Sequence, residues 1–210
     1  GFMILYFACE TFNLTRTLKA LGEKSSFLRN FRYTLIGFFF SSITPAASGG
    51  QPMEIYYMNR DGLGVGNSTL ALLVNLTSMQ IVTISMGIIC LFFNLDAMNT
   101  ALIVLFIIGI LLNASALILL LISICSKRMT NAIIRFAIRV MKFFKVKNME
   151  KKQEWINAQL EIYQANAGYV KTHKRLIFRT IITTYIQFFF YYSIPYWIYR
   201  SFGYSSANDL

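Results

Sequence analysis

One stretch of the chain combines helix-breaking residues with a carboxylate, between two apolar segments. It runs from Thr44 to Glu54 and contains Pro45, the pair Gly49-Gly50 and Pro52. A broken backbone beside hydrocarbon is tolerated only where protein or a water-filled cavity satisfies its amide groups. Small residues allow close approach to the backbone, and free backbone amides can hold an anionic group. The stretch is therefore a candidate binding site for a charged ligand.

Glu54 is the residue of this stretch best suited to a chemical role. An unpaired carboxylate at the centre of a bilayer costs at least ~2 to 3 kcal/mol on insertion scales. A side chain retained at that cost is usually a counter-charge or a proton carrier. The alternative is structural, because Glu54 follows Pro52 by two positions and a carboxylate in the first helical turn favours the positive end of the helix dipole.

The other candidates are small or polar residues in or near the break. With Glu54, the candidate substrate-binding residues are Thr44, Pro45, Ser48, Gly49, Gly50, Gln51, Arg60 and Gln80. Structural roles compete with binding: glycines permit tight packing, a glutamine inside a bundle bonds a neighbouring helix, and Arg60 begins a plain turn. Metal-ligand spacing, phosphate-binding loops, dinucleotide fingerprints and nucleophile elbows are missing from the sequence, so we expect no metal, no cofactor and no catalytic residue.

The composition predicts a polytopic membrane protein. Of the 210 residues, 56% are hydrophobic and only 14% are charged, whereas soluble domains carry roughly 25% charged residues. The net charge is +11, and thirteen of the twenty Lys and Arg lie between residues 127 and 179. Clustered positive charge predicts a cytoplasmic location and contact with anionic headgroups. A nucleic-acid surface is the competing interpretation, but it leaves the apolar segments on both sides unexplained.

The alternation of apolar and basic segments predicts a topology. Full spans are expected at 68–93 and 100–125, and a last, aromatic span at 176–199. The apolar run 33–43 reaches only about half of a ~30 Å hydrocarbon core. Because the basic segments before and after the two full spans are both expected to be cytoplasmic, 33–60 must begin and end on that side. This predicts a re-entrant hairpin with its tip at 45–50; a single irregular span is the alternative.

A basic amphipathic helix is expected after the second full span. Its cations recur at helical spacing on one face, between apolar residues: Arg128, Arg135, Arg139, Lys142 and Lys145. Such a helix fits the membrane interface, where these side chains would contact lipid headgroups. A solvated helix packed on the end of the bundle is the alternative.

The predicted fold class is therefore all-α. We expect a polytopic transmembrane helix bundle with a re-entrant helix hairpin and a cytoplasmic amphipathic helical segment. Residues 1–210 are expected to form a single transmembrane domain, and we interpret the chain as a fragment of a longer protein.

The run from Ser42 to Tyr57 resembles the transmembrane domain of the lysylphosphatidylglycerol synthase/flippase family. The glycine-rich turn after it, and the apolar span with scattered polar residues that follows, are part of the resemblance. The core of the resemblance is the pattern Thr-Pro-x-x-x-Gly-Gly-x-Pro-x-Glu at 44–54. It implies a bacterial plasma-membrane protein that binds and translocates anionic or lysylated phosphatidylglycerol and so gives resistance to cationic peptides. The expected partners are such a phospholipid and the membrane, without nucleic acid; a homo-oligomer is left open.

The resemblance also leaves two other functions open. One is the membrane part of a phosphatidylglycerol lysyltransferase, which presents lipid to a soluble domain that uses lysyl-tRNA. The other is a non-transporting scaffold for a cell-envelope partner. The family carries a second Pro-Gly-Gly with a downstream Glu, which with the first resembles an inverted repeat around a midplane site. We expect this chain to hold the first half-site only, at 44–54, without the second repeat half or a soluble transferase domain.

Overall fold

The computed structural model describes residues 1–93, 99–126, 128, 130–132, 135, 138–139 and 149–203. Throughout these residues, every regular element is a helix, which confirms the all-α prediction. The helices are α1 (Phe2–Ala20), α2 (Phe27–Ile43), the 3-10 turn η1 (Pro45–Ala47), α3 (Gly50–Arg60), α4 (Val65–Phe93), α5 (Thr100–Cys125), α7 (Met149–Thr172) and α8 (Lys174–Ser201).

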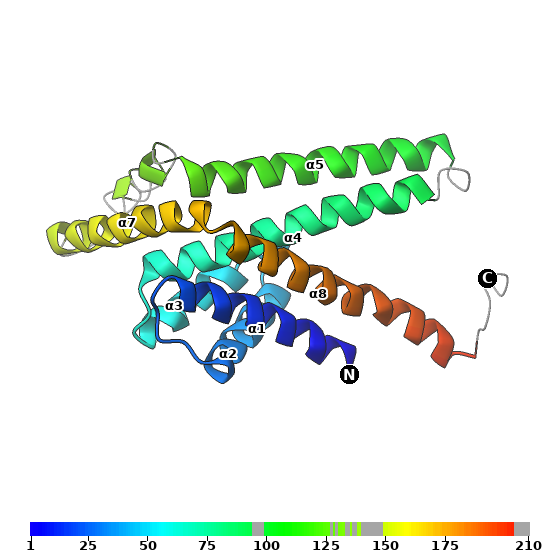
Figure 1. Ribbon diagram of the computed structural model, residues 1–210, viewed down its shortest axis with the longest axis horizontal. Coiled ribbons are helices and arrows are strands. Elements are labelled where there is room, and N and C mark those ends of the chain that lie inside the picture. The colour runs from blue at the N-terminus through cyan, green and yellow to red at the C-terminus, as the bar shows by residue number, and fades with distance from the viewer. Residues whose placement is uncertain are drawn as a thin grey trace.

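The helices α4 and α5 are the two membrane-spanning candidates in the described part of the chain. They have 29 and 26 residues, and 26 residues reach about 39 Å, more than a ~30 Å hydrocarbon core. They run side by side in Figure 1 and pack against each other. The side chains of α5 are largely exposed, with Leu105 at 65% and Leu112 at 65%. An exposed apolar face of this length fits contact with lipid, so the sequence prediction of two full spans is confirmed by length and composition.

The helices α1 and α8 pack along each other in opposite directions. The Asn13 Nδ2 donates to Thr184 Oγ1 at 3.0 Å, while the ring of Phe2 stacks on Trp197 with 5.9 Å between centroids. Figure 1 shows the two helices crossing the front of the molecule together. Polar residues interrupt the apolar ones in α8, and it is not one of the two helices apolar enough to span a membrane, so the predicted last span at 176–199 is not confirmed.

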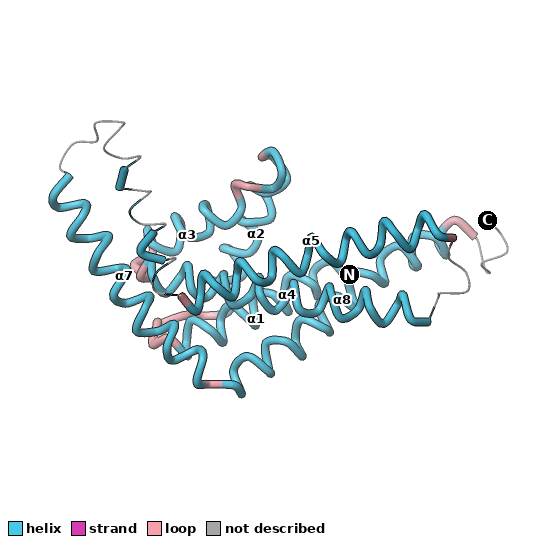
Figure 2. Tube along the Cα trace, turned by 90° about the horizontal axis from the view of Figure 1, so that it is seen from above, coloured by secondary structure: helices cyan, strands magenta, loops and turns pink. Residues whose placement is uncertain are grey.

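The helices α2 and α3 form an antiparallel hairpin. Ser26 caps α2, which begins six residues before the apolar run that starts at Tyr33. The helix ends where Thr44 adopts an extended backbone, with φ −110° and ψ 144°, as expected for a residue before proline. At the open end of the hairpin, Arg32 of α2 forms an ion pair with Asp61 just after α3. Figure 2 shows the two helices side by side with the short connection at one end.

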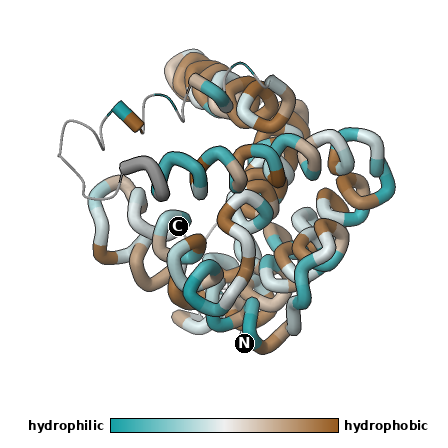
Figure 3. The backbone as a smooth tube through the Cα atoms, turned by 90° about the vertical axis from the view of Figure 1, so that its left-hand side faces the viewer, coloured by the Kyte–Doolittle hydropathy of each residue, from teal (hydrophilic) through white to brown (hydrophobic). Residues whose placement is uncertain are grey.

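Several chain segments meet at one end of the bundle. Glu23, just after α1, accepts hydrogen bonds from Gly64 N at 3.1 Å and Asn67 Nδ2 at 2.8 Å. At the start of α4, Gly66 N donates to Gln159 Oε1 of α7 at 3.0 Å. The hairpin thus ends at the same end of the bundle at which α1 ends and α4 begins. Figure 3 looks onto this end, where hydrophilic stretches alternate with hydrophobic ones.

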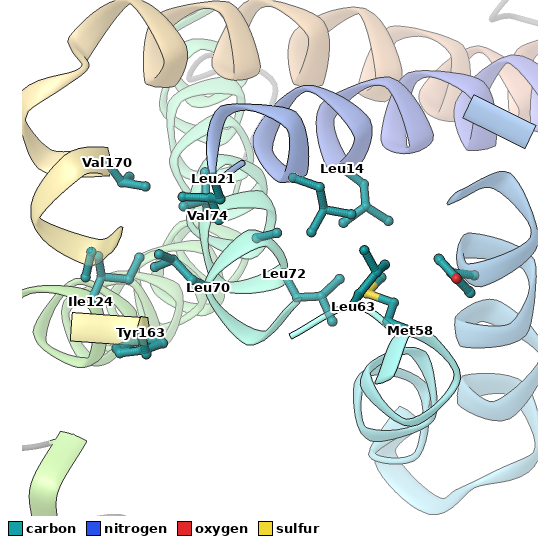
Figure 4. Packing of buried hydrophobic residues seen from close by; sticks show 14 residues of the cluster. Leu14, Leu21, Met58, Leu63, Leu70, Leu72, Val74, Ile124, Tyr163 and Val170 are labelled. Carbon is teal, nitrogen blue, oxygen red and sulfur yellow. The ribbon is translucent and has the colours of Figure 1, made fainter. Parts of the chain in front are cut away.

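A hydrophobic cluster joins these elements. It is built from Leu14 and Leu18 of α1, Met58 of α3 and Leu70 of α4, each 0 to 1% exposed. Figure 4 shows Leu14, Met58 and Leu72 directed toward a shared space, with Tyr163 and Ile124 at its far side. Full burial of an aliphatic side chain stabilises a fold by ~1.5 to 3 kcal/mol. The cluster therefore fixes the hairpin against α1 and α4.

The predicted amphipathic helix lies mostly where the structure gives no description. Arg128, Arg135 and Arg139 are exposed. Lys142 and Lys145 lie outside the described residues, so contact of this segment with lipid headgroups stays a prediction.

Candidate functional site

The two hairpin helices approach each other at glycines. A Cβ atom on Gly50 would lie 2.7 Å from the carbonyl oxygen of Gly37 and would overlap the Ser41 hydroxyl. A Cβ atom on Gly37 would overlap the carboxylate of Glu54. A side chain at Gly50 would press on the backbone of α2, and one at Gly37 would require the Glu54 side chain to move. Gly50 therefore serves the close packing that was one of its two predicted uses, and it brings α3 near enough for Glu54 to lie against α2.

Glu54 is buried between the helices, with 6% of its surface exposed. Across the described ranges, its carboxylate takes part in no hydrogen bond and no ion pair. A buried carboxylate without a partner is unfavourable, so such a group takes up a proton or pairs with a cation. This arrangement is one that a cationic ligand group or a proton would complete.

A second carboxylate, which was not among the predicted site residues, lies nearby on α1. Glu10 is partly buried and accepts hydrogen bonds at 3.5 Å from Asn75 Nδ2 of α4 and Gln187 Nε2 of α8. Its helix packs against α2, the helix on which Glu54 rests. The polar interior thus joins α1, α3, α4 and α8. The signal that would have found Glu10 is the one used for Glu54, an ionisable residue in an apolar segment.

The hairpin tip is held by local hydrogen bonds. Thr44 Oγ1 accepts from Gly49 N at 2.9 Å and donates to Phe40 O at 2.7 Å. The Gly49 amide is therefore already used within the tip. The Ser48 hydroxyl donates to Pro45 O at 2.9 Å, and both residues are exposed. Gln51, in the first turn of α3, is exposed as well.

Neither of the remaining predicted residues, Arg60 and Gln80, forms a hydrogen bond or ion pair with Glu54 in the described part of the chain. Arg60 is exposed and follows Glu54 by six residues, or about 9 Å along the helix. Its neighbour Asp61 turns to α2 instead, where the Tyr33 hydroxyl donates to it at 2.5 Å. That hydrogen bond and the adjacent Arg32 lower the pKa of Asp61. Gln80 is partly buried on α4, and its Oε1 has no hydrogen-bond partner among the described residues.

The structure brings only some of the predicted residues together, and the polar interior also includes residues that were not predicted. Glu54 and Gly50 lie at one contact; Thr44, Pro45, Ser48 and Gly49 form the tip beyond it. Glu10, Asn75 and Gln187 complete the polar interior. No group of three or more metal-ligating side chains occurs within the described residues.

Comparison with known proteins places this site in a family. A family model described as "Lysylphosphatidylglycerol synthase TM region" matches residues 2–207. The searches of curated proteins and of solved structures found no match. The matched range includes every described helix, the hairpin with Glu54 and the two apolar spans. The chain is therefore a membrane protein that belongs to the lysylphosphatidylglycerol synthase transmembrane-region family.

Proposed function

We propose that this protein binds an anionic or aminoacylated phospholipid and moves it across the plasma membrane of a bacterium. The observation that carries the proposal is the Glu54 carboxylate, buried without a partner between two helices of an antiparallel hairpin. Membership of the family and the two apolar helices support the membrane setting and the class of lipid.

In this proposal the hairpin is re-entrant and forms half of a headgroup cavity. It enters and leaves the bilayer on the cytoplasmic side, where Arg32, Asp61 and Tyr33 close its base. Its tip, Pro45 to Ser48, then reaches into the membrane. A break of this kind at bilayer depth is tolerated where it lines a cavity.

Glu54 supplies the counter-charge for a headgroup that crosses the bilayer. A cationic group in hydrocarbon costs at least ~2 to 3 kcal/mol on insertion scales. Pairing an ammonium group with the Glu54 carboxylate offsets this cost, and it also removes the unfavourable unpaired state of the carboxylate. Both changes lower the barrier for an aminoacylated headgroup at the depth of the hairpin.

The basic segment after α5 gathers substrate at the inner leaflet. Arg128, Arg135 and Arg139 are exposed, and Lys142 and Lys145 follow in the same segment. A lysine or arginine close to an anionic membrane surface contributes about 1 kcal/mol of attraction. Together, these cations would concentrate anionic lipid next to the hairpin base.

The test is the exposure of lysylated lipid on the outer leaflet of cells that carry the full chain. Glu54→Gln keeps the shape of the side chain and removes its charge, so an amine-reactive reagent that cannot cross the membrane should label much less lipid. Glu161→Gln, at an exposed position on α7, is the matched control. Both variants should be recovered folded and in equal amount. Unchanged labelling in folded Glu54→Gln would contradict the proposal.

A second candidate function is favoured by the name of the matched family, which includes a synthase. In that function the hairpin presents phosphatidylglycerol to a lysyltransferase domain. Measuring total lysylated lipid separates the two: Glu54→Gln should lower its synthesis in the second case, and should lower only its exposure in the first.

A further inference from the structure

The bundle interior holds a second carboxylate that the proposed function does not use. Glu10 of α1 accepts hydrogen bonds at 3.5 Å from the side-chain amides of Asn75 and Gln187. Both amides are buried, with 5% and 0% of the residue exposed. These neutral donors contact the Glu10 carboxylate without neutralising it.

Glu10 belongs to α1, which packs against α2, and Glu54 rests against Gly37 of α2, so the two carboxylates are neighbours in the bundle interior. The packing of α1 on α2 explains this proximity. Thr11 Oγ1 donates to Thr34 Oγ1 at 3.2 Å, and Gly37, one turn further along α2, contacts Glu54. No Lys, Arg or His among the described residues forms an ion pair with either carboxylate. Two like charges held together in a bundle interior are unfavourable until a positive charge lies between them or one carboxylate takes up a proton.

The side chain of Asn75 gives an independent sign of a ligand. Its Nδ2 atom donates to Glu10, which places the amide beside that carboxylate. Its Oδ1 atom is buried and accepts no hydrogen bond from any described residue. A buried acceptor without a donor costs ~1 to 3 kcal/mol. A cation or an N–H group at the carboxylates would supply the missing partner.

We propose that Glu10, Glu54 and Asn75 together bind one small monovalent cationic group. The group is either the ammonium of an aminoacylated lipid headgroup or a free alkali ion. An ammonium has three donors, which match the two carboxylates and the Asn75 oxygen; an alkali ion takes the same oxygen ligands. The inference rests on the proposed function because Glu54 belongs to both, and it adds Glu10 and Asn75 as residues that recognise the positive charge.

The test uses the full chain in nanodiscs of phosphatidylglycerol, with and without lysyl-phosphatidylglycerol, and measures the midpoint of thermal unfolding. A ligand that binds only the folded state raises this midpoint. We expect the lysylated lipid to raise it by several degrees in the wild type and in the control Glu161→Gln. Glu10→Gln and Glu54→Gln should each abolish the rise. In phosphatidylglycerol alone, Glu10→Gln should unfold no earlier than the wild type, because it removes a repulsion.

A salt series distinguishes the two sources of the cation. In phosphatidylglycerol nanodiscs, sodium chloride replaces N-methylglucamine chloride at constant ionic strength. A rise with sodium that needs both carboxylates identifies a free ion, whereas a rise with the lysylated lipid alone identifies the headgroup. Both results support the site. A wild type that responds to neither would overturn it.

The inference and the proposed function can fail separately. If Glu10→Gln keeps the full response while Glu54→Gln loses it, Glu10 is not part of the site, although lipid movement through Glu54 stands. If folded Glu54→Gln exposes lipid normally but loses the thermal response, the cation site stands and the proposed function does not. If Glu10→Gln does not fold, Glu10→Asp replaces it, because this variant withdraws the charge by one methylene. An undiminished rise of the unfolding midpoint in Glu10→Asp would overturn the inference.

Discussion

The Glu54 carboxylate of α3 rests against the bare backbone of Gly37 on α2. A Cβ atom at Gly37 would overlap that carboxylate, and one at Gly50 would press on the Gly37 carbonyl. The lack of side chains at these two positions thus lets the helices touch and leaves the space that Glu54 occupies. The packing of the hairpin and the position of its charge depend on the same residues.

Gly37→Ala should reduce lipid exposure and stability together. The added methyl group must push Glu54 or α3 away, and overpacking of this kind costs ~1 to 3 kcal/mol. Thermal unfolding and outer-leaflet labelling measure the two effects. Gly109→Ala is the matched control, because a Cβ atom there meets no atom within 4 Å. Normal labelling and an unchanged unfolding midpoint for Gly37→Ala would show that this contact does not position Glu54.

Thr44→Val should loosen the hairpin tip. The Thr44 hydroxyl accepts from Gly49 N and donates to Phe40 O. Its loss leaves the partly buried Gly49 amide without this partner, at a cost below the ~1 to 3 kcal/mol of a fully buried group. Hydrogen exchange of peptides from residues 44–50 should become faster. Ser42→Ala is the control, since that exposed hydroxyl donates only to Phe38 O of its own helix at 2.9 Å. Equal exchange in both variants would contradict this role of Thr44.

Ala46→Gly should stabilise the protein. Ala46 has φ 52° and ψ 27°, a left-handed conformation that costs a residue with a Cβ atom ~1 to 2 kcal/mol. Glycine removes that cost and loses ~0.4 to 1 kcal/mol through the greater freedom of the unfolded chain. The unfolding midpoint should therefore rise slightly. Ala114→Gly, inside α5, should instead lower it by the ordinary helix penalty of about 1 kcal/mol. A fall in both variants would contradict the strain at Ala46.

Asp61→Asn should make the protein less sensitive to acid. The Tyr33 hydroxyl and Arg32 lower the pKa of Asp61, so the folded state favours the charged form. This stabilisation is fully present above the ordinary aspartate pKa of ~3.9 and is lost as the pH falls through the lowered value. Unfolding midpoints from about pH 6 down to 3 should fall less steeply for the variant than for the wild type. Parallel curves would show that Asp61 contributes nothing.

The sequence was sufficient to predict the break between α2 and α3 and the two apolar spans α4 and α5. Pro45 and the residues around Gly49 cannot continue a helix, and the break falls where those residues stand. The relative positions of the helix ends followed from helix length and from the distribution of basic residues. The start of α2 at Phe27 was missed, because the Ser26 cap lies outside the apolar run that was used to find the helix.

The hydrogen bonds around Glu10 could not be predicted from local patterns. Glu10, Asn75 and Gln187 come from three helices that are distant in sequence, and their contacts depend on the packing of α1 with α4 and α8. The use of the Gly49 amide by Thr44 likewise depends on the backbone of the tip. Spacing within one segment contains no information on contacts of this kind.

Cysteine accessibility in intact cells tests the central claim, that α2 and α3 form a re-entrant hairpin, most directly. Single cysteines replace Asn59 at the hairpin base, Ser48 at its tip and Thr100 at the start of α5, in a chain without Cys9, Cys90 and Cys125. The account predicts that position 100 labels from outside and that position 59 labels only after permeabilisation. Labelling at position 48 should decrease when lysylated lipid is added. Labelling of position 59 from outside would mean that the segment crosses the membrane, which contradicts the re-entrant hairpin and the half-site built on Glu54.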